Sequence, residues 1–288
     1  MMETTPLFSV LIANYNNGKY ISSAINSVIA QTYTNWEIII VDDCSADNSL
    51  RIIEQYKNHD NIKIAKNDKN KGCGYTKRRC AELAGGLLCG FLDSDDELLP
   101  NALEVMVQAH IQHPECSLIG SRSYRCNANL QPYGVTKYKM IPKGQSYLTF
   151  DCHAPYHYAT FKKQLYDKTE GISANVTHAV DQDLYFKLDE VGQVLFLNKI
   201  LYKYRVHNNG ISNSSNSFGK ALFWHIILIC EAYKRRGLQG ADQHATRIII
   251  AHPYRSWKYR FGNFCLTPII LFIRIINIIR FYLFANGK

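Results

Sequence analysis

Several features that define other classes of protein are missing from this sequence. The nine cysteines include no C-x-x-C pair and their number is odd, so no disulfide framework is indicated. The opening stretch, MMETTPLFSV, has no basic segment and contains Glu3, which argues against a secretion signal. We find no internal repeat, no low-complexity tract and no G-x-x-x-x-G-K phosphate loop. These absences favour a reduced protein of the cytoplasm.

The composition is that of a folded, basic protein. The chain has 288 residues, of which 47% are hydrophobic and 20% charged, enough for one large domain or one domain with an appendage. Its formal net charge of +9 suits nucleic acid, an anionic membrane or phosphorylated small molecules. Clustered aromatic residues with RNA-type motifs are missing, so we expect no nucleic-acid partner.

Strand-like and helix-like segments alternate in the first hundred residues. Uniformly apolar runs predict buried strands in LFSVLIANYN, WEIIIVDD, NIKIAKN and LLCGFLD. Helical spacing separates them in GKYISSAINSVIAQ, in residues 50–57 and in GCGYTKRRCAELAGG. Buried strands alternating with helices are typical of an α/β fold with a mostly parallel sheet covered on both faces.

Polar residues follow three of these strands where each ends, at Asn14–Tyr15, Asp42–Asp43 and Asp93–Asp96. Ligands of parallel α/β sheets bind beyond the carboxyl ends of the strands. The three clusters therefore predict one site at one edge of the sheet.

The acidic cluster suggests a metal. Asp93, Asp95 and Asp96 fall within four positions, and two carboxylates at i and i+2 can face one Mg²⁺ or Mn²⁺ ion. An ordinary aspartate-rich turn is the alternative. The nearby basic loop, which contains Lys71, Lys77, Arg78 and Arg79, favours the metal, because a cation and basic side chains on one rim suit a diphosphate.

These motifs together carry a resemblance to a known family. The stretch SVLIANYNNGKYISSAINSVIAQTYTNWEIIIVDDCSADNS, followed by NKG, KRR, AGG and FLDSDD, resembles glycosyltransferase family 2. The resemblance covers residues 8 to about 115 and continues weakly to about 212. It implies the GT-A fold, with a Rossmann-like sheet, and an inverting enzyme that uses a nucleotide-sugar donor.

The resemblance also implies roles on the donor side. The expected donor is a UDP-sugar, with Asp43 accepting a hydrogen bond from the uracil and Lys77 facing the diphosphate where the family often has arginine. Asp95 would be the metal ligand, with Asp93 nearer the ribose. The remaining donor-binding residues implied by the resemblance are Ala13, Asn14, Tyr15 and Ser94.

On the acceptor side, the resemblance implies a general base in AVDQDLYFKL. Asp181 aligns with the family's base, and Asp183 is the alternative. A helix N-terminus also favours acids through its dipole, without any catalytic role. His207, in YRVHNNGIS, corresponds to a family histidine and would be a metal ligand or contact the diphosphate, although a polar-loop histidine can also be merely solvated.

Residues 120–175 are expected to set acceptor selectivity. His153 and His157 stand at helical spacing, but Pro155 between them argues against a zinc-binding helix. We interpret both as acceptor-side loop residues.

The composition changes near Phe218. We expect a catalytic domain over residues 1–215 and a basic helical region over 216–288. From Arg255 to Lys288 there are six Lys/Arg and no acid, and Arg274, Asn277 and Arg280 share one helical side. Peripheral contact with the inner face of a membrane is therefore expected, with a core helix or a membrane span as alternatives.

The prediction from sequence is a metal-dependent glycosyltransferase acting on a glycan or lipid-linked acceptor. Two alternatives stay open at this point. One is another nucleotide-sugar enzyme, such as a nucleotidyltransferase, and the other is a non-catalytic basic binding protein.

Overall fold

The computed structural model describes residues 5–142, 144–150, 157–207 and 217–245. The chain divides into two compact units, Met1–Phe218 and Gly219–Lys288. Helix α8 (Ser217–Arg235) leads into the second unit, in agreement with the helical composition expected there. No helix in the described ranges combines the length and hydropathy needed to cross a membrane. The basic tail lies outside those ranges.

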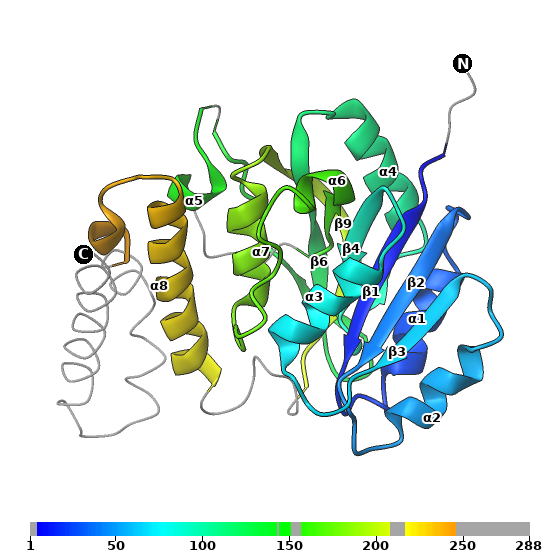
Figure 1. Ribbon diagram of the computed structural model, residues 1–288. Coiled ribbons are helices and arrows are strands. Elements are labelled where there is room, and N and C mark those ends of the chain that lie inside the picture. The colour runs from blue at the N-terminus through cyan, green and yellow to red at the C-terminus, as the bar shows by residue number, and fades with distance from the viewer. Residues whose placement is uncertain (1–4, 143, 151–156, 208–216, 246–288) are drawn as a thin grey trace. The chain divides into compact units, whose positions relative to one another are not determined.

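The first unit is built around one sheet of nine strands (Figure 1). Its order is β3-β2-β1-β4-β8-β6-β9-β5, and β7 pairs with β6. The strands are β1 (Phe8–Asn14), β2 (Trp36–Asp42), β3 (Ile62–Lys66), β4 (Leu88–Phe91), β5 (Glu97–Leu98), β6 (Cys116–Cys126), β7 (Pro132–Val135), β8 (Ala159–Lys162) and β9 (Gln193–Arg205).

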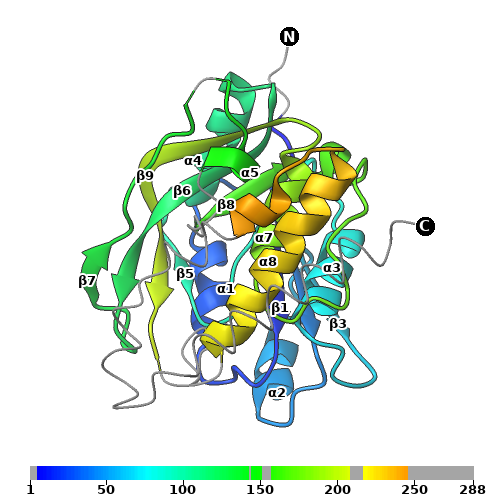
Figure 2. The same cartoon turned by 90° about the vertical axis from the view of Figure 1, so that its left-hand side faces the viewer.

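The sheet is mixed but mostly parallel, which confirms the predicted fold class. Strand β1 runs parallel to β2 and β4, and β2 runs parallel to β3. Strand β8 is antiparallel to β4 and β6, whereas β6 and β9 are parallel (Figure 2). The sequence did not predict β5, β7 or β8. Strand β5 has two residues, and β7 and the start of β8 fall in the turn-rich stretch 127–160, where no apolar run marks a strand.

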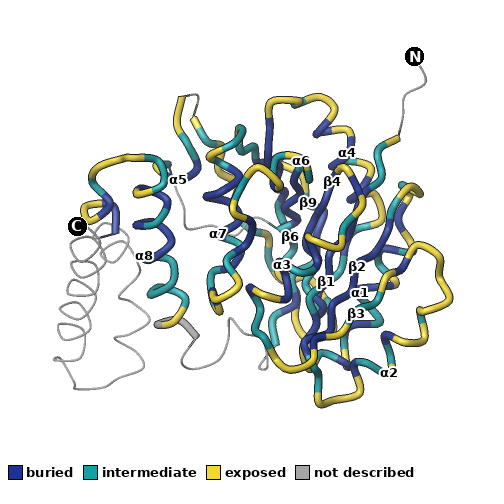
Figure 3. The backbone as a smooth tube through the Cα atoms, viewed as in Figure 1, coloured by how far each residue is buried: buried dark blue, intermediate teal, exposed yellow. Residues whose placement is uncertain are grey.

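Helices flank the sheet, and they include the three that the helical spacing predicts in the first hundred residues. They are α1 (Ile21–Ile29), α2 (Ser49–Ile53) with the short helix η1 (Glu54–Tyr56), α3 (Cys73–Leu83), α4 (Ala102–Gln112), α5 (Tyr147–Phe150), α6 (Lys163–Tyr166) and α7 (Val180–Leu188). Helix α1 buries Ile21, Ala24, Ile25 and Val28, the stripe expected from its sequence. In Figure 3 the strands of the sheet carry many of the buried residues.

Strand register brings the predicted polar residues together. Asn14 pairs with Asp42 at the ends of β1 and β2, and Asp42 pairs with Lys66 at the end of β3. The acidic turn after β4 reaches the same edge, where the Asn17 amide donates to the hydroxyl of Ser94 (2.8 Å). The polar residues of the predicted site therefore lie together at the carboxyl ends of β1, β2 and β4.

Candidate active site

A buried lysine joins two acidic residues from different parts of the chain. Nζ of Lys77, on α3, lies 3.1 Å from Oδ1 of Asp93 and 2.8 Å from Oδ1 of Asp181, in the first turn of α7. Burial opposes the charge of Lys77, but Asp181 and Asp93 outweigh it and raise its pKa well above the ordinary value. Burial would raise the pKa of Asp181, yet Lys77 and then His157 hold that pKa below the ordinary range. The result is an ionised carboxylate beside a lysine ammonium.

The three aspartates after β4 occupy different environments, which explains how the turn tolerates them. Asp93 pairs with Lys77, and its backbone N–H donates to the hydroxyl of Tyr202 (3.2 Å). Asp96 is buried, where it accepts the backbone N–H of Arg205 (2.6 Å). Burial, then Asp95 and Asp93, raises the pKa of Asp96 well above its ordinary value, which favours its neutral form.

Asp95 faces His207 across the site. Nε2 of His207 lies 2.7 Å from Oδ2 of Asp95, and both side chains are largely buried. Burial and Asp93 raise the pKa of Asp95, while His207 opposes that rise. The carboxylate oxygen is a ligand type that Mn²⁺ and Mg²⁺ favour, and an imidazole nitrogen can serve as a further ligand. Within the described ranges no cluster of three or more potential metal-ligating side chains occurs, so a divalent ion here would take its other ligands from water and substrate phosphate, as Mg²⁺ sites commonly do.

Arg205 and Tyr20 contact Asp95 and His207 and help to fix their positions. The Arg205 guanidinium donates from Nε to the Asp95 carbonyl (2.5 Å) and from Nη1 to the Ala128 carbonyl (2.7 Å). It also lies over the Tyr20 ring, 4.4 Å from the centroid. The Tyr20 ring in turn packs against the His207 ring, with centroids 4.9 Å apart. Asp95, His207, Tyr20 and Arg205 therefore form a closed ring of contacts.

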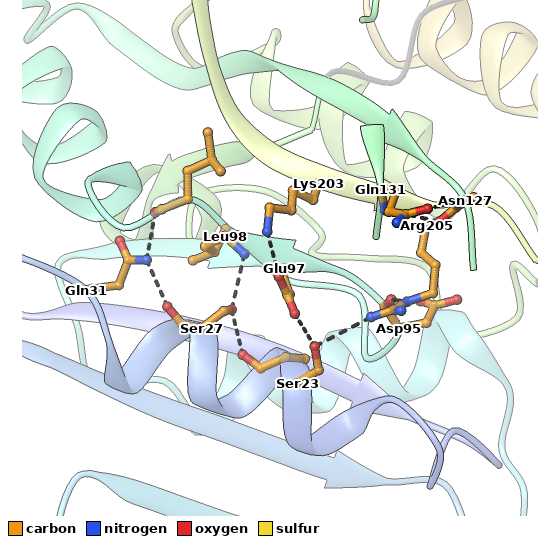
Figure 4. Close-up of polar contacts among 12 residues, drawn as sticks. Ser23, Ser27, Gln31, Asp95, Glu97, Leu98, Asn127, Gln131, Lys203 and Arg205 are labelled. Carbon is orange, nitrogen blue, oxygen red and sulfur yellow. Dashed lines mark hydrogen bonds and ion pairs between the residues drawn. The ribbon is translucent and has the colours of Figure 1, made fainter. Parts of the chain in front are cut away.

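Helix α1 fixes the strand that follows the acidic turn (Figure 4). Ser23 donates to Glu97, whose other oxygen accepts Nζ of Lys203 (3.0 Å). The Ser27 hydroxyl accepts the backbone N–H of Leu98 (3.1 Å). Polar residues on α1 thereby hold β5 and the acidic turn in place.

Asp43 organises the loop before α3. Its carboxylate accepts the side-chain amide of Asn67 (2.7 Å) and the backbone N–H groups of Lys71 and Gly72, each at 2.8 Å. Asn67 follows β3 as the other polar residues follow their strands, so the same signal could have identified it. Arg79 donates to the Asn67 side-chain oxygen (2.5 Å), which adds a positive charge at this end of the site.

The four remaining predicted donor-binding residues occupy mixed environments. Asn14 is buried and donates to Asp42 (2.8 Å), while Tyr15 is 47% exposed and Ala13 is half-buried. Ser94 is buried against Asn17. These four residues all lie at the edge formed by the carboxyl ends of β1 and β4.

Asp183, the alternative base, does not face the site. It forms a buried ion pair with Lys187 (2.9 Å) and accepts the backbone N–H of Ser173 (2.6 Å). Arg78 likewise turns away, pairing with Glu82 on its own helix. Sequence reasoning missed Tyr202, Tyr20 and Arg205, because a role that depends on contacts between distant segments leaves no local signal. Of the two loop histidines, His153 lies outside the described residues.

The class of protein follows from the sheet and its acidic edge. The structure matches that of S. aureus TarS 1–349 in complex with UDP-GlcNAc with a TM-score of 0.73 and 19% identity, covering 95% of this chain and 80% of that one. It also matches the mannosyltransferase PcManGT from Pyrobaculum calidifontis in complex with GDP-Man and Mn²⁺, with a TM-score of 0.58 and 14% identity, covering 96% of this chain and 81% of that one. At these identities the matches define the fold, which is the GT-A fold of glycosyltransferases.

Sequence comparison then gives the family. Residues 9–174 match the family described as Glycosyl transferase family 2, and the chain belongs to this family. It is 31% identical over 248 residues to a chondroitin synthase of Escherichia coli, a match covering 83% of this chain and 34% of that protein. The chain thus spans about a third of the length of that relative. Membership of this family favours glycosyl transfer over the nucleotidyltransferase and the non-catalytic binding protein.

Proposed function

We propose that this chain transfers a sugar from a UDP-sugar to a glycan or lipid-linked acceptor, with inversion and metal assistance. The observation that supports this most is the lysine bridge, because Lys77 joins Asp93 at the tip of β4 to Asp181 on α7. A donor-side and an acceptor-side carboxylate thus share one buried ammonium. The UDP-GlcNAc complex of TarS supports a uridine donor, and the chondroitin synthase supports a glycan acceptor.

The proposed reaction is one in-line displacement. The acceptor hydroxyl oxygen forms a bond to the anomeric carbon while the bond from that carbon to the diphosphate oxygen breaks, and the electron pair leaves on the diphosphate. Asp181 takes the hydroxyl proton. A single displacement inverts the anomeric configuration. Because Lys77 and His157 keep Asp181 ionised, the base is ready without prior deprotonation.

In this proposal Asp95 and His207 would hold Mn²⁺ or Mg²⁺. The bound ion supplies positive charge for the leaving diphosphate. Lys77 provides a second charge from the other side of the acidic turn. Arg205 and Tyr20 keep the two ligands oriented, as outer contacts commonly do in metal sites.

At the other end, Asp43 would bind the uracil and also anchor the loop over residues 71–72. Ala13, Asn14 and Tyr15 would border the base, and Ser94 would lie near the ribose with Asp93. Asp43 already accepts three N–H groups. A carboxylate has about four lone-pair positions, so one remains for the base.

We further propose that residues 1–215 form the catalytic domain and that residues 216–288 contact the cytoplasmic face of a membrane. The basic, acid-free stretch from Arg255 to Lys288 supports this assignment. Deleting residues 264–288 should release the protein from phosphatidylglycerol vesicles, and unchanged co-sedimentation would count against the contact.

The catalytic proposal is tested by titrating the protein with UDP, GDP and UDP-sugars, with and without Mn²⁺, in a calorimeter. We expect binding of the uridine nucleotides that depends on the metal. The anomeric configuration of any transferred sugar, read by NMR, then tests inversion. Binding of GDP in preference to UDP, or retention at the anomeric carbon, would refute it.

A further inference from the structure

Exposed apolar side chains gather on one short segment after β6. Tyr133 and Val135, on β7, are 59% and 39% exposed, and Tyr138 and Met140 just beyond are 37% and 64% exposed. Four large exposed apolar residues within eight positions form a concentrated patch, and such patches commonly mark binding surfaces. β7 lies at the margin of the sheet and, among the described strands, pairs with β6 alone (Figure 2).

The same segment is strongly basic. No Asp or Glu occurs between Glu115 and Asp151, whereas that stretch includes Arg122, Arg125, Lys137, Lys139 and Lys143. The guanidinium of Arg125 lies over the ring of Tyr133, 5.9 Å from its centroid. Lys137 and Lys139 are exposed on either side of Tyr138. We call Arg125, Tyr133, Lys137, Tyr138 and Lys139 the β7 strip.

Two hydrogen bonds show that this strip is ordered rather than a loose loop. The Tyr138 hydroxyl donates to the Phe196 carbonyl on β9 (3.3 Å). Arg122 donates to the Thr136 carbonyl (2.9 Å). The backbone is therefore fixed on the sheet, while the residues of the β7 strip are exposed.

The strip begins next to the candidate active site. The turn between β6 and β7 contains Ala128, whose carbonyl accepts Nη1 of Arg205. The same guanidinium donates to the carbonyl of Asp95. Figure 4 shows Arg205 between Asp95 and the turn residues Asn127 and Gln131. A linear ligand lying on the strip would have one end close to Asp95.

We propose that the β7 strip binds an acidic glycan, the acceptor whose end is extended at the active site. This inference rests on the proposed function and adds the chemical class of the acceptor. Arginine and lysine pair with carboxylate or phosphate groups, and tyrosine rings offer apolar faces against which sugar rings can pack. An anionic membrane fits less well, because interfacial segments insert Trp, Phe and Leu from an amphipathic helix.

The test uses the full chain and an oligosaccharide of alternating glucuronic acid and N-acetylglucosamine, with maltohexaose as the neutral control. Calorimetry should show binding of the acidic oligosaccharide, weakened by salt, and no binding of the neutral one. The double variant Lys137→Gln/Lys139→Gln should raise the dissociation constant of the acidic oligosaccharide about tenfold, since each exposed ion pair contributes modestly. The double variant Lys57→Gln/Lys168→Gln removes two exposed lysines elsewhere and should bind as the parent does.

The inference is overturned if both oligosaccharides bind equally, if the two double variants lose the same affinity, or if the strip variant loses only binding to phosphatidylglycerol vesicles. UDP and Mn²⁺ binding is measured on the same samples and should be unchanged in both variants. Absence of UDP binding from every sample, with glycan binding intact, would contradict the proposed function and leave the strip assignment standing.

Discussion

His207 and Asp95 are 112 positions apart in the sequence, yet Nε2 of the histidine lies 2.7 Å from Oδ2 of the aspartate. The contact depends on β9 passing beside the acidic turn, since Arg205 at the end of β9 bonds to the backbone of Asp95 and the side chain of Asp96. The fold thereby brings together the two proposed metal ligands, one from the turn before β5 and one just after β9, the strand that pairs with β5.

Asp95→Asn should abolish this site while leaving the fold intact. The amide keeps the size of the side chain but loses the negative charge that attracts a divalent ion. We expect Mn²⁺ affinity, followed by electron paramagnetic resonance, to fall at least about a hundredfold, together with metal-dependent turnover. An unchanged circular dichroism spectrum is the control, and full activity in the variant would refute the assignment.

Arg205→Lys should weaken metal binding without removing either ligand. Lysine keeps the charge but cannot reach two carbonyls and stack on Tyr20 with one planar group. We expect Mn²⁺ affinity to fall about tenfold, as for loss of an outer contact at a metal site. A variant that folds normally and binds Mn²⁺ as tightly as the parent would show that Arg205 does not position Asp95.

Asp181→Asn should leave UDP binding intact and lower the rate of transfer about 10²–10⁴-fold, the usual contribution of a general base. Asp183→Asn is the informative comparison. It breaks a buried ion pair, so we expect a loss of about 3–5 kcal/mol in the free energy of unfolding, seen as a lower urea midpoint. A rate loss in Asp183→Asn with normal stability would instead make Asp183 the base.

Lys77→Met should change the pH dependence of transfer. In the parent chain Lys77 and His157 lower the pKa of Asp181, so the acid limb of the kcat profile lies below the ordinary aspartate range. Without Lys77, burial becomes the main influence and raises that pKa. We expect the acid limb to move upward by about one pH unit or more. An acid limb that does not move would show that Asp181 is not the group whose ionisation controls the rate.

His110, which lies away from the candidate active site, should make the free energy of unfolding fall at acid pH. It is buried on α4, 3.0 Å from the Thr160 hydroxyl, and burial lowers its pKa to about 3. Because the unfolded chain binds a proton near pH 6.5 and the folded chain does not, stability is lost as the pH falls below 6.5. Between pH 7.5 and 5.0 this residue should account for about 2 kcal/mol.

The check is urea unfolding of the parent and of His110→Gln at both pH values. The glutamine variant should lose less stability than the parent between the two. Equal losses would mean that His110 is not the group responsible.

The parallel half of the sheet was predictable because β1, β2 and β4 are apolar runs with polar ends. The acidic turn and Asp43 were predictable for the same reason. Arg205, Tyr20 and Tyr202 were not, since their roles arise from β9 and α1 meeting the turn after β4. Asp96 carries the same side chain as Asp95, and the two are distinguished by their partners, the Arg205 backbone for Asp96 and His207 for Asp95.

The most direct test is a crystal structure of the protein with UDP and Mn²⁺, with the metal located by anomalous scattering. We expect the anomalous peak at the Asp95 carboxylate and His207 imidazole, with the diphosphate bound to the ion and near Lys77. A diphosphate bound elsewhere, or a metal peak away from Asp95, would contradict the account.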